Sequence, residues 1–152
     1  MENETQTRQP AKPRKNKRVD YIVAIVINVI VLIIANLILS WGIMPFLTDS
    51  FKQVLPIFNA SLSATVIANA IFLLFDPDWF TSLLRVGLNA LAVAVAARFL
   101  AVFPFDFSAY PGFDWATLAR VLLIIGIVGA SIAILVEALK FLTAVINFIR
   151  RR

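Results

Sequence analysis

The chain has 152 residues, 61% of them hydrophobic, against roughly 45 to 50% in an ordinary soluble domain. It contains no cysteine and no histidine, which excludes disulfides, thiol nucleophiles, imidazole bases and nearly every zinc, iron or copper site. Nine of the fourteen basic residues lie in the first eighteen and last three positions, where they flank apolar segments. The net charge of +5 therefore does not indicate nucleic-acid binding.

The first segment, residues 1–19, is polar and basic and has no apolar periodicity, so we predict a disordered tail. The next segment predicts a first membrane span at about residues 21–46, with a helix ended by Gly42 and Pro45. It is longer than the apolar part of a cleaved signal peptide, about 7 to 15 residues, and therefore stays as an anchor. The basic residues that precede it predict a cytoplasmic N-terminus.

Two further spans are predicted at about residues 51–75 and 79–103. Ser50 and Gln53 are spaced as a capping box, which predicts that the second helix begins there. Asp76 and Asp78 flank a proline in a turn that permits only a tight hairpin, and Asp78 is the predicted N-cap of the third helix. Small residues of the third span recur at helical spacing and predict a seam for close packing with another helix. They are Gly87, Ala90, Ala94, Ala97 and Ala101.

The fourth span is predicted at about residues 115–137, after an aromatic loop that we expect to lie among lipid headgroups. Asp114 is the predicted cap of this helix. Beyond Glu137 polar and apolar residues separate onto two faces, which predicts an amphipathic, basic segment at residues 139–152. The pattern leaves open whether this segment continues the fourth helix or bends onto the membrane.

Together these segments predict an all-α membrane protein of the cell membrane, with an antiparallel bundle of four transmembrane helices over residues 20–138. A disordered basic tail precedes the bundle, and a basic amphipathic extension follows it. An even number of crossings places both termini in the cytoplasm.

Five asparagines in the spans are predicted to make polar contacts between helices. Position along the helices places Asn28 and Asn69 in the inner half of the membrane, and Asn36 and Asn59 in the outer half. Antiparallel packing of the first two helices therefore predicts two amide pairs, each worth roughly 0.6 to 2 kcal/mol. Asn89, near the middle of the third span, is expected either to join helices or to belong to a polar site.

The remaining charged residues of the spans lie near the helix ends. At the outer end Arg98 and Arg120 have similar depth, and the loop between their helices supplies Asp106 and Asp114. These four residues predict either a structural salt-bridge cluster or a site for an anion or a lipid headgroup. At the inner end we expect Arg85 to meet Asp76 or Asp78, and Glu137 to pair with Lys140.

The sequence contains no nucleophile with an obvious base and no phosphate-binding loop, so an enzyme is not expected, nor is a cofactor or a metal. We predict an accessory or interaction subunit whose basic ends contact anionic lipid headgroups or a protein partner. The alternative is a small homo-oligomeric transporter or channel with a polar site among Asn28, Asn69, Asn89 and Arg98.

Overall fold

The computed structural model describes residues 17–150, and in this part of the chain every regular element is helical. The elements are α1 (Lys17–Trp41), the short 3-10 helix η1 (Asp49–Gln53), α2 (Leu55–Leu74), α3 (Asp78–Val102) and α4 (Trp115–Arg150). Each α-helix is long and apolar enough to cross a membrane. The predicted all-helical class with four candidate spans is confirmed. Residues 1–16 of the predicted tail, and the last two residues, lie outside the described part.

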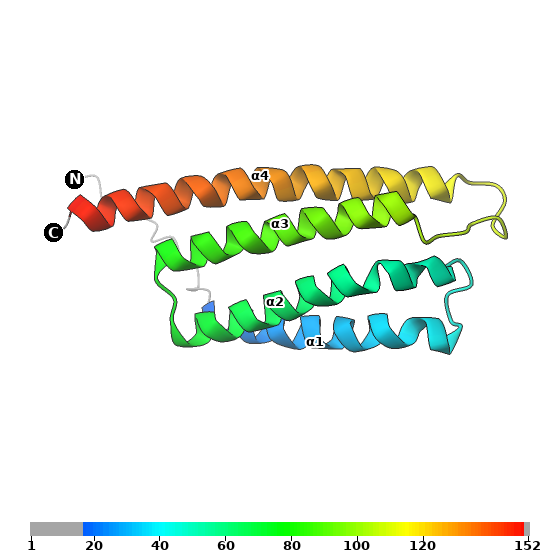
Figure 1. The fold of residues 1–152 in the computed structure, drawn as a ribbon, viewed down its shortest axis with the longest axis horizontal. Coiled ribbons are helices and arrows are strands. Elements are labelled where there is room, and N and C mark those ends of the chain that lie inside the picture. Colours follow the sequence, from blue (N-terminus) through cyan, green and yellow to red (C-terminus); the bar gives the residue numbers. More distant parts are fainter. Residues whose placement is uncertain (1–16, 151–152) are drawn as a thin grey trace, which may run out of the picture.

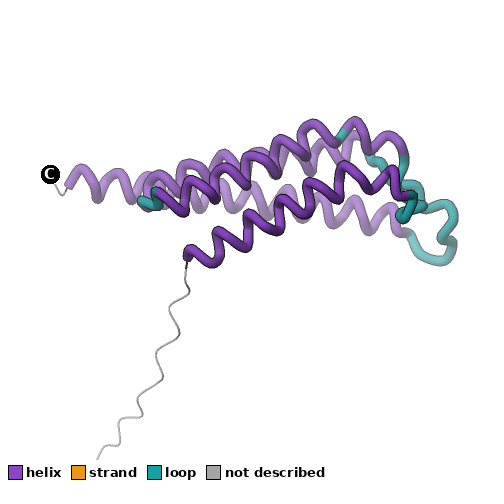
Figure 2. The backbone as a smooth tube through the Cα atoms, turned by 90° about the horizontal axis from the view of Figure 1, so that it is seen from below, coloured by secondary structure: helices purple, strands orange, loops and turns teal. Residues whose placement is uncertain are grey.

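The helices lie side by side in chain order, and each runs back alongside the one before it (Figure 1). The α3–α4 contact is the most extensive, the α1–α2 contact is next, and the α2–α3 contact is smaller. The fold is therefore two helical hairpins joined along α2 and α3. Figure 2 shows α1 diverging from the other helices toward its N-terminus. We call the end that holds the α2–α3 turn the inner end, and the opposite end the outer end.

The boundaries of α1 differ slightly from the prediction. The helix begins at Lys17, so residues 17–19 are helical and do not belong to a disordered tail. It ends at Trp41, and Gly42 follows with a positive φ of 62°. A glycine adopts this left-handed conformation without the steric cost of a Cβ, which is why helices so often end at one.

The predicted capping box at Ser50 and Gln53 is wrong. These two residues lie in η1, and α2 begins at Leu55 without a side-chain cap. Pro56 occupies the first turn of α2, where the missing N–H has no helical partner to lose. The Ser50 hydroxyl is instead 2.6 Å from the Thr48 hydroxyl.

Two predictions for α3 are also corrected. Asp78 is its first helical residue and makes no capping hydrogen bond, and the Thr81 hydroxyl donates to the carbonyls of Pro77 and Asp78. The seam of small residues is largely exposed, and a Cβ at Gly87 would meet nothing within 4 Å. The described helices therefore leave most of this seam uncovered.

Helix α4 continues without interruption from Trp115 to Arg150, which answers the question that the sequence left open. The Asp114 carboxylate accepts a hydrogen bond from the Thr117 N–H at 2.9 Å, so the predicted cap is confirmed. At 36 residues this helix is about 54 Å long, which exceeds a hydrocarbon core of about 30 Å. Its C-terminal part extends beyond the inner end of α3 (Figure 1).

The two connections at the outer end pair with each other. The Thr48 N–H donates to the Pro104 carbonyl at 3.0 Å, and the Asp106 N–H donates to the Phe46 carbonyl at 2.8 Å. Leu47 and Phe105 lie opposite each other in this bridge. The pairing links the α1–α2 hairpin to the α3–α4 hairpin.

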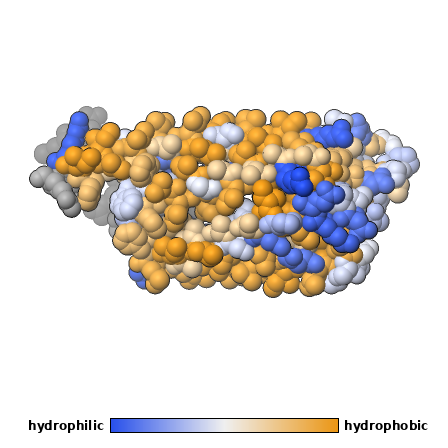
Figure 3. Space-filling model, in the orientation of Figure 1, coloured by the Kyte–Doolittle hydropathy of each residue, from blue (hydrophilic) through white to orange (hydrophobic). Residues whose placement is uncertain are grey.

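On the face drawn in Figure 3, apolar side chains cover most of the surface between the two ends. Large residues such as Ile27, Ile125 and Leu135 are more than half exposed. A soluble monomer rarely exposes a continuous apolar surface of this size, whereas lipid tails cover it without cost. The surface therefore agrees with the four candidate spans.

Candidate functional site

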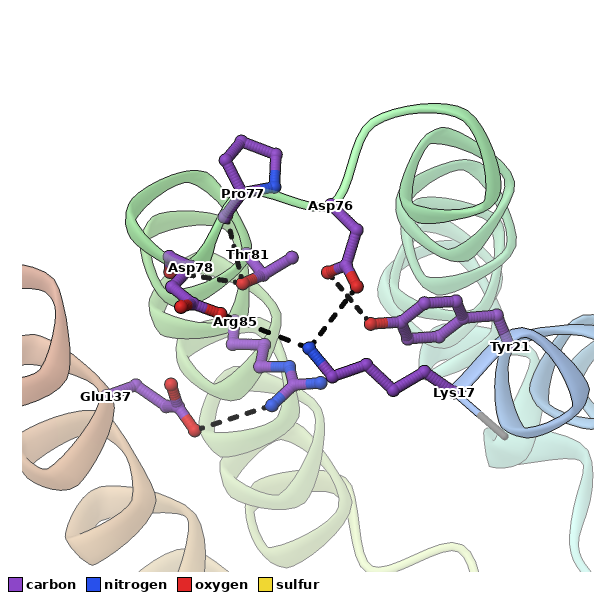
Figure 4. A network of polar contacts seen from close by, with 8 residues as sticks. All are labelled: Lys17, Tyr21, Asp76, Pro77, Asp78, Thr81, Arg85 and Glu137. Atoms are coloured by element: carbon purple, nitrogen blue, oxygen red, sulfur yellow. Dashed lines mark hydrogen bonds and ion pairs between the residues drawn. The ribbon is translucent and has the colours of Figure 1, made fainter. Parts of the chain in front are cut away.

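Six charged side chains from α1, α3, α4 and the α2–α3 turn meet at the inner end. Figure 4 shows all of them except Lys140. We call this set the inner charge cluster: Lys17, Asp76, Asp78, Arg85, Glu137 and Lys140. They line a cavity of about 420 Å³, together with hydroxyl and amide side chains that include Tyr21, Ser82 and Asn147. Three of the charges are positive and three negative, so the cluster is neutral as a whole.

The first half of the cluster ties the start of α1 to the α2–α3 turn. Lys17 Nζ lies 3.4 Å from Asp76 Oδ2 and 4.0 Å from Asp78 Oδ1. The Tyr21 hydroxyl donates a hydrogen bond of 2.9 Å to Asp76 Oδ1, and its ring packs against Phe72 at 5.4 Å between centroids. Tyr21 is buried, and its hydrogen bond to the ionised Asp76 carboxylate fixes the position of that partly buried side chain. Sequence reasoning missed both partners of Asp76.

The second half joins α3 to α4 through Glu137, which is only 8% exposed. Glu137 Oε1 accepts a hydrogen bond from Lys140 Nζ at 2.8 Å, which confirms that predicted pair. It also lies 3.8 Å from Arg85 Nη1. The expected pairing of Arg85 with Asp76 or Asp78 is wrong for the described residues, because the guanidinium forms its ion pair with Glu137 of α4 (Figure 4). Glu137 Oε2 is buried and has no hydrogen-bond partner among the described residues.

The chemistry of the cluster is that of charge neutralisation. A carboxylate buried in a membrane helix is costly unless cations compensate it, and Glu137 has two within 4 Å. In the described part of the chain no three His, Cys, Asp or Glu residues lie where they could hold a metal ion. The arrangement therefore supports cohesion between α1, α3, α4 and the α2–α3 turn.

No protein-family model, curated protein or solved structure matches this chain.

The predicted interhelical asparagines divide into two groups. Asn36 and Asn59 face each other across α1 and α2, and each donates to the other, at 3.0 and 2.9 Å. Asn28 and Asn69 do not form the expected pair, because each donates to a carbonyl four residues earlier in its own helix. Asn89 is half-buried, and its side-chain amide makes no hydrogen bond to the described residues.

The four charged residues predicted at the outer end do not form ion pairs with one another among residues 17–150. Arg98 Nε is 3.4 Å from the Gln53 carbonyl oxygen, and the Arg120 guanidinium lies over the Phe103 ring at 4.4 Å. Asp106, Asp114 and Arg120 line a common cavity of about 440 Å³ that Arg98 does not line.

The two loop carboxylates at the outer end are held by local hydrogen bonds. The Asp106 carboxylate accepts from the Ser108 backbone N–H at 2.9 Å, and this bond lowers the pKa of Asp106. Hydrogen bonds from Thr117 lower the pKa of Asp114, and the contribution of its hydroxyl is larger than that of its backbone N–H. Both groups are fully exposed, so they carry negative charge to the outer surface.

The residues predicted for a transport site are spread over the fold. Asn28 and Asn69 are occupied by their own helices, and Arg98 is bonded to the α1–α2 connection at the outer end. No hydrogen bond joins any two of Asn28, Asn69, Asn89 and Arg98 in the described chain. The structure brings together the inner charge cluster instead.

Proposed function

We propose that the protein is a non-enzymatic integral membrane protein of the cell membrane, an accessory or interaction subunit whose inner end contacts anionic lipid headgroups. Its four helices cross the bilayer as an antiparallel bundle with both termini in the cytoplasm. The observation that carries this proposal is the unequal distribution of charge between the two ends of the helices.

The outer end is electrically balanced. Its basic residues are Lys52, Arg98 and Arg120, and its acidic residues are Asp49, Asp106 and Asp114. The whole net charge of +5 therefore belongs to the inner helix ends and the sequence that flanks them. An excess of Lys and Arg supports a cytoplasmic inner end, and each such residue near an anionic leaflet contributes about 1 kcal/mol of attraction.

The neutral inner charge cluster contributes to this function by positioning. Lys17 and Tyr21 hold the start of α1 to the α2–α3 turn, and Glu137 holds α4 to α3. The basic flanks of α1 and α4 are thereby kept at one surface of the membrane. The flanks, which include Arg150, supply the excess charge that attracts anionic headgroups.

The absence of cysteine from the sequence makes the topology directly testable. We would introduce Thr5→Cys, Ser108→Cys or Arg152→Cys singly and treat intact cells with a membrane-impermeant maleimide. Labelling of Ser108→Cys alone is expected, with the other two reacting only after the cells are opened. Labelling of either terminal variant in intact cells would overturn the topology and the lipid contact that rests on it.

Lipid contact is tested by thermal unfolding of the purified full-length chain in a neutral detergent with added phosphatidylglycerol or phosphatidylcholine. Phosphatidylglycerol should raise the melting temperature, and Arg150→Gln with Arg151→Gln should remove at least half of that rise. The matched outer-end variant, Lys52→Gln with Arg98→Gln, should keep it. Equal losses in both variants would contradict the proposal.

The alternative function, a small transporter or channel, is tested by reconstituting the protein in liposomes. Flux of a substrate or ion that Asn89→Leu abolishes would support that function instead.

A further inference from the structure

The outer end has a second cavity, and every described residue that lines it is aromatic. It has a volume of about 330 Å³, and its walls are Phe46, Phe107, Tyr110 and Trp115. These residues come from three separate places: the connection after α1, the loop after α3, and the first position of α4. We call this cavity the aromatic pocket. Its volume falls within the range of small-molecule sites, about 300 to 1,000 Å³.

The walls of the aromatic pocket are fixed by contacts between the two outer connections. The Asp106 N–H donates to the Phe46 carbonyl at 2.8 Å, and the Phe46 and Phe107 rings stack at 5.5 Å between centroids. The Tyr110 N–H donates to the Phe107 carbonyl at 2.9 Å, which closes the turn that carries both rings. A site held in this way loses little conformational entropy when a ligand enters.

Charge near the aromatic pocket favours a cation. The neighbouring cavity of about 440 Å³ shares Phe107 and Trp115 with it and is also lined by Asp106 and Asp114. Both carboxylates are fully exposed, and local hydrogen bonds stabilise their ionised forms. Arg120 lines the neighbouring cavity too, but its guanidinium lies over Phe103 and does not line the aromatic pocket.

We propose that the aromatic pocket binds a quaternary ammonium group. The faces of aromatic rings attract such a group through cation–π interactions, and this cation has no N–H that would need an acceptor. A metal ion or a primary ammonium would lose its water in this pocket, because the described residues that line it carry no polar side-chain group besides the Tyr110 hydroxyl and the Trp115 N–H. The inference concerns the outer end and is independent of the lipid contact proposed for the inner end.

Two sources share this chemistry: a soluble quaternary ammonium compound, and the trimethylammonium headgroup of a lipid in the outer leaflet. An aromatic belt at the membrane surface uses the same residue types, but its rings anchor the helices one by one and form no saturable site. Saturation by a soluble probe therefore separates a binding pocket from a belt.

The test uses the full-length chain in a detergent that lacks choline. Trp41→Phe and Trp79→Phe leave Trp115 as the single tryptophan, so its fluorescence reports binding in the aromatic pocket. Tetramethylammonium chloride should change Trp115 fluorescence saturably, whereas NaCl at equal ionic strength should not. Tyr110→Leu should weaken this binding about three- to tenfold, because Tyr110 is 42% exposed and its loss removes one ring without unfolding the chain. Phe75→Leu, an exposed ring at the inner end, is the matched control and should leave binding unchanged.

The same titration in nanodiscs identifies the source. If the fluorescence response to tetramethylammonium is lost in phosphatidylcholine nanodiscs but kept in phosphatidylglycerol nanodiscs, the pocket binds the lipid headgroup. If the response is kept in both, the pocket binds a soluble ligand. A response that does not saturate in detergent, or one that Tyr110→Leu and Phe75→Leu weaken equally, would overturn the proposal. Neither result bears on the topology or the lipid contact of the inner end.

Discussion

Asn36 on α1 and Asn59 on α2 exchange two amide hydrogen bonds, each side chain donating to the other. The distances are 3.0 Å for the bond that Asn36 donates and 2.9 Å for the bond that Asn59 donates. Asn36 also donates to the Leu32 carbonyl at 2.7 Å, so both of its amide protons are satisfied. The two bonds join α1 to α2, and the lipid that we propose around these helices offers no water to replace them.

We expect a double-mutant cycle of Asn36→Leu and Asn59→Leu to give a coupling energy of about 0.6 to 2 kcal/mol. Each single variant leaves the other amide without its partner, whereas the double variant replaces both by apolar groups. The measurement is unfolding of the purified protein in detergent. A coupling energy indistinguishable from zero would show that the pair does not stabilise the α1–α2 hairpin.

Asn28→Leu is the matched control for that cycle. Asn28 lies on the same helix but donates only to the Ala24 carbonyl, so its replacement should not be coupled to Asn59→Leu. Strong coupling between Asn28 and Asn59 would indicate a general effect of removing asparagines from α1.

Tyr21→Phe should destabilise the protein by about 1 to 2 kcal/mol, because it removes the hydrogen bond of 2.9 Å to Asp76 and keeps the ring. Thermal unfolding in detergent measures the loss. Tyr110→Phe is the control, since the Tyr110 hydroxyl makes no hydrogen bond to the described residues. If the two variants unfold at the same temperature, the Tyr21 hydroxyl does not hold α1 to the inner turn.

At Glu137, loss of the cations should cost more than loss of the acid. The Arg85 and Lys140 side chains are 45% and 55% exposed and can be solvated without a partner, whereas the Glu137 side chain is 11% exposed and cannot. Arg85→Gln with Lys140→Gln should therefore destabilise by about 1 to 3 kcal/mol, and Glu137→Gln by less. The reverse order in unfolding experiments would contradict the account of the inner charge cluster.

The cap of α4 should weaken in acid. The pKa of Asp114 is lower in the folded chain than in the unfolded chain, because the folded state stabilises its ionised form through Thr117. Its contribution is therefore complete above the unfolded pKa and is lost as the pH falls through the folded pKa. Hydrogen exchange at the Thr117 amide, corrected for intrinsic rates, should report this loss of protection.

Asp114→Asn keeps an oxygen acceptor but cannot titrate, so the Thr117 amide should lose its dependence on acid in this variant. Asp106→Asn is the matched control, because it removes another loop carboxylate whose hydrogen bond is to Ser108. An unchanged pH profile in Asp114→Asn would refute the assignment of the cap.

The sequence by itself determined the features that depend on local pattern. Long uncharged runs predicted four helices of membrane-crossing length, and these are present. The position of Asp114 before an apolar run predicted the cap of α4, and the spacing of Glu137 and Lys140 predicted their pair. The cap and the ion pair each depend on residues within one helical turn, where the backbone alone sets the distance between side chains.

Only the tertiary structure decided which distant residues meet. The pairing of Asp76 with Lys17 and Tyr21, of Arg85 with Glu137, and of the two outer connections depends on the rotation and offset of each helix relative to its neighbours. Apolar side chains lie nearly all round α2 and α4, so the sequences of these two helices do not specify a single face for packing. Rotating a helix about its axis by the angle that separates two successive residues, about 100°, is enough to replace one set of polar partners by another.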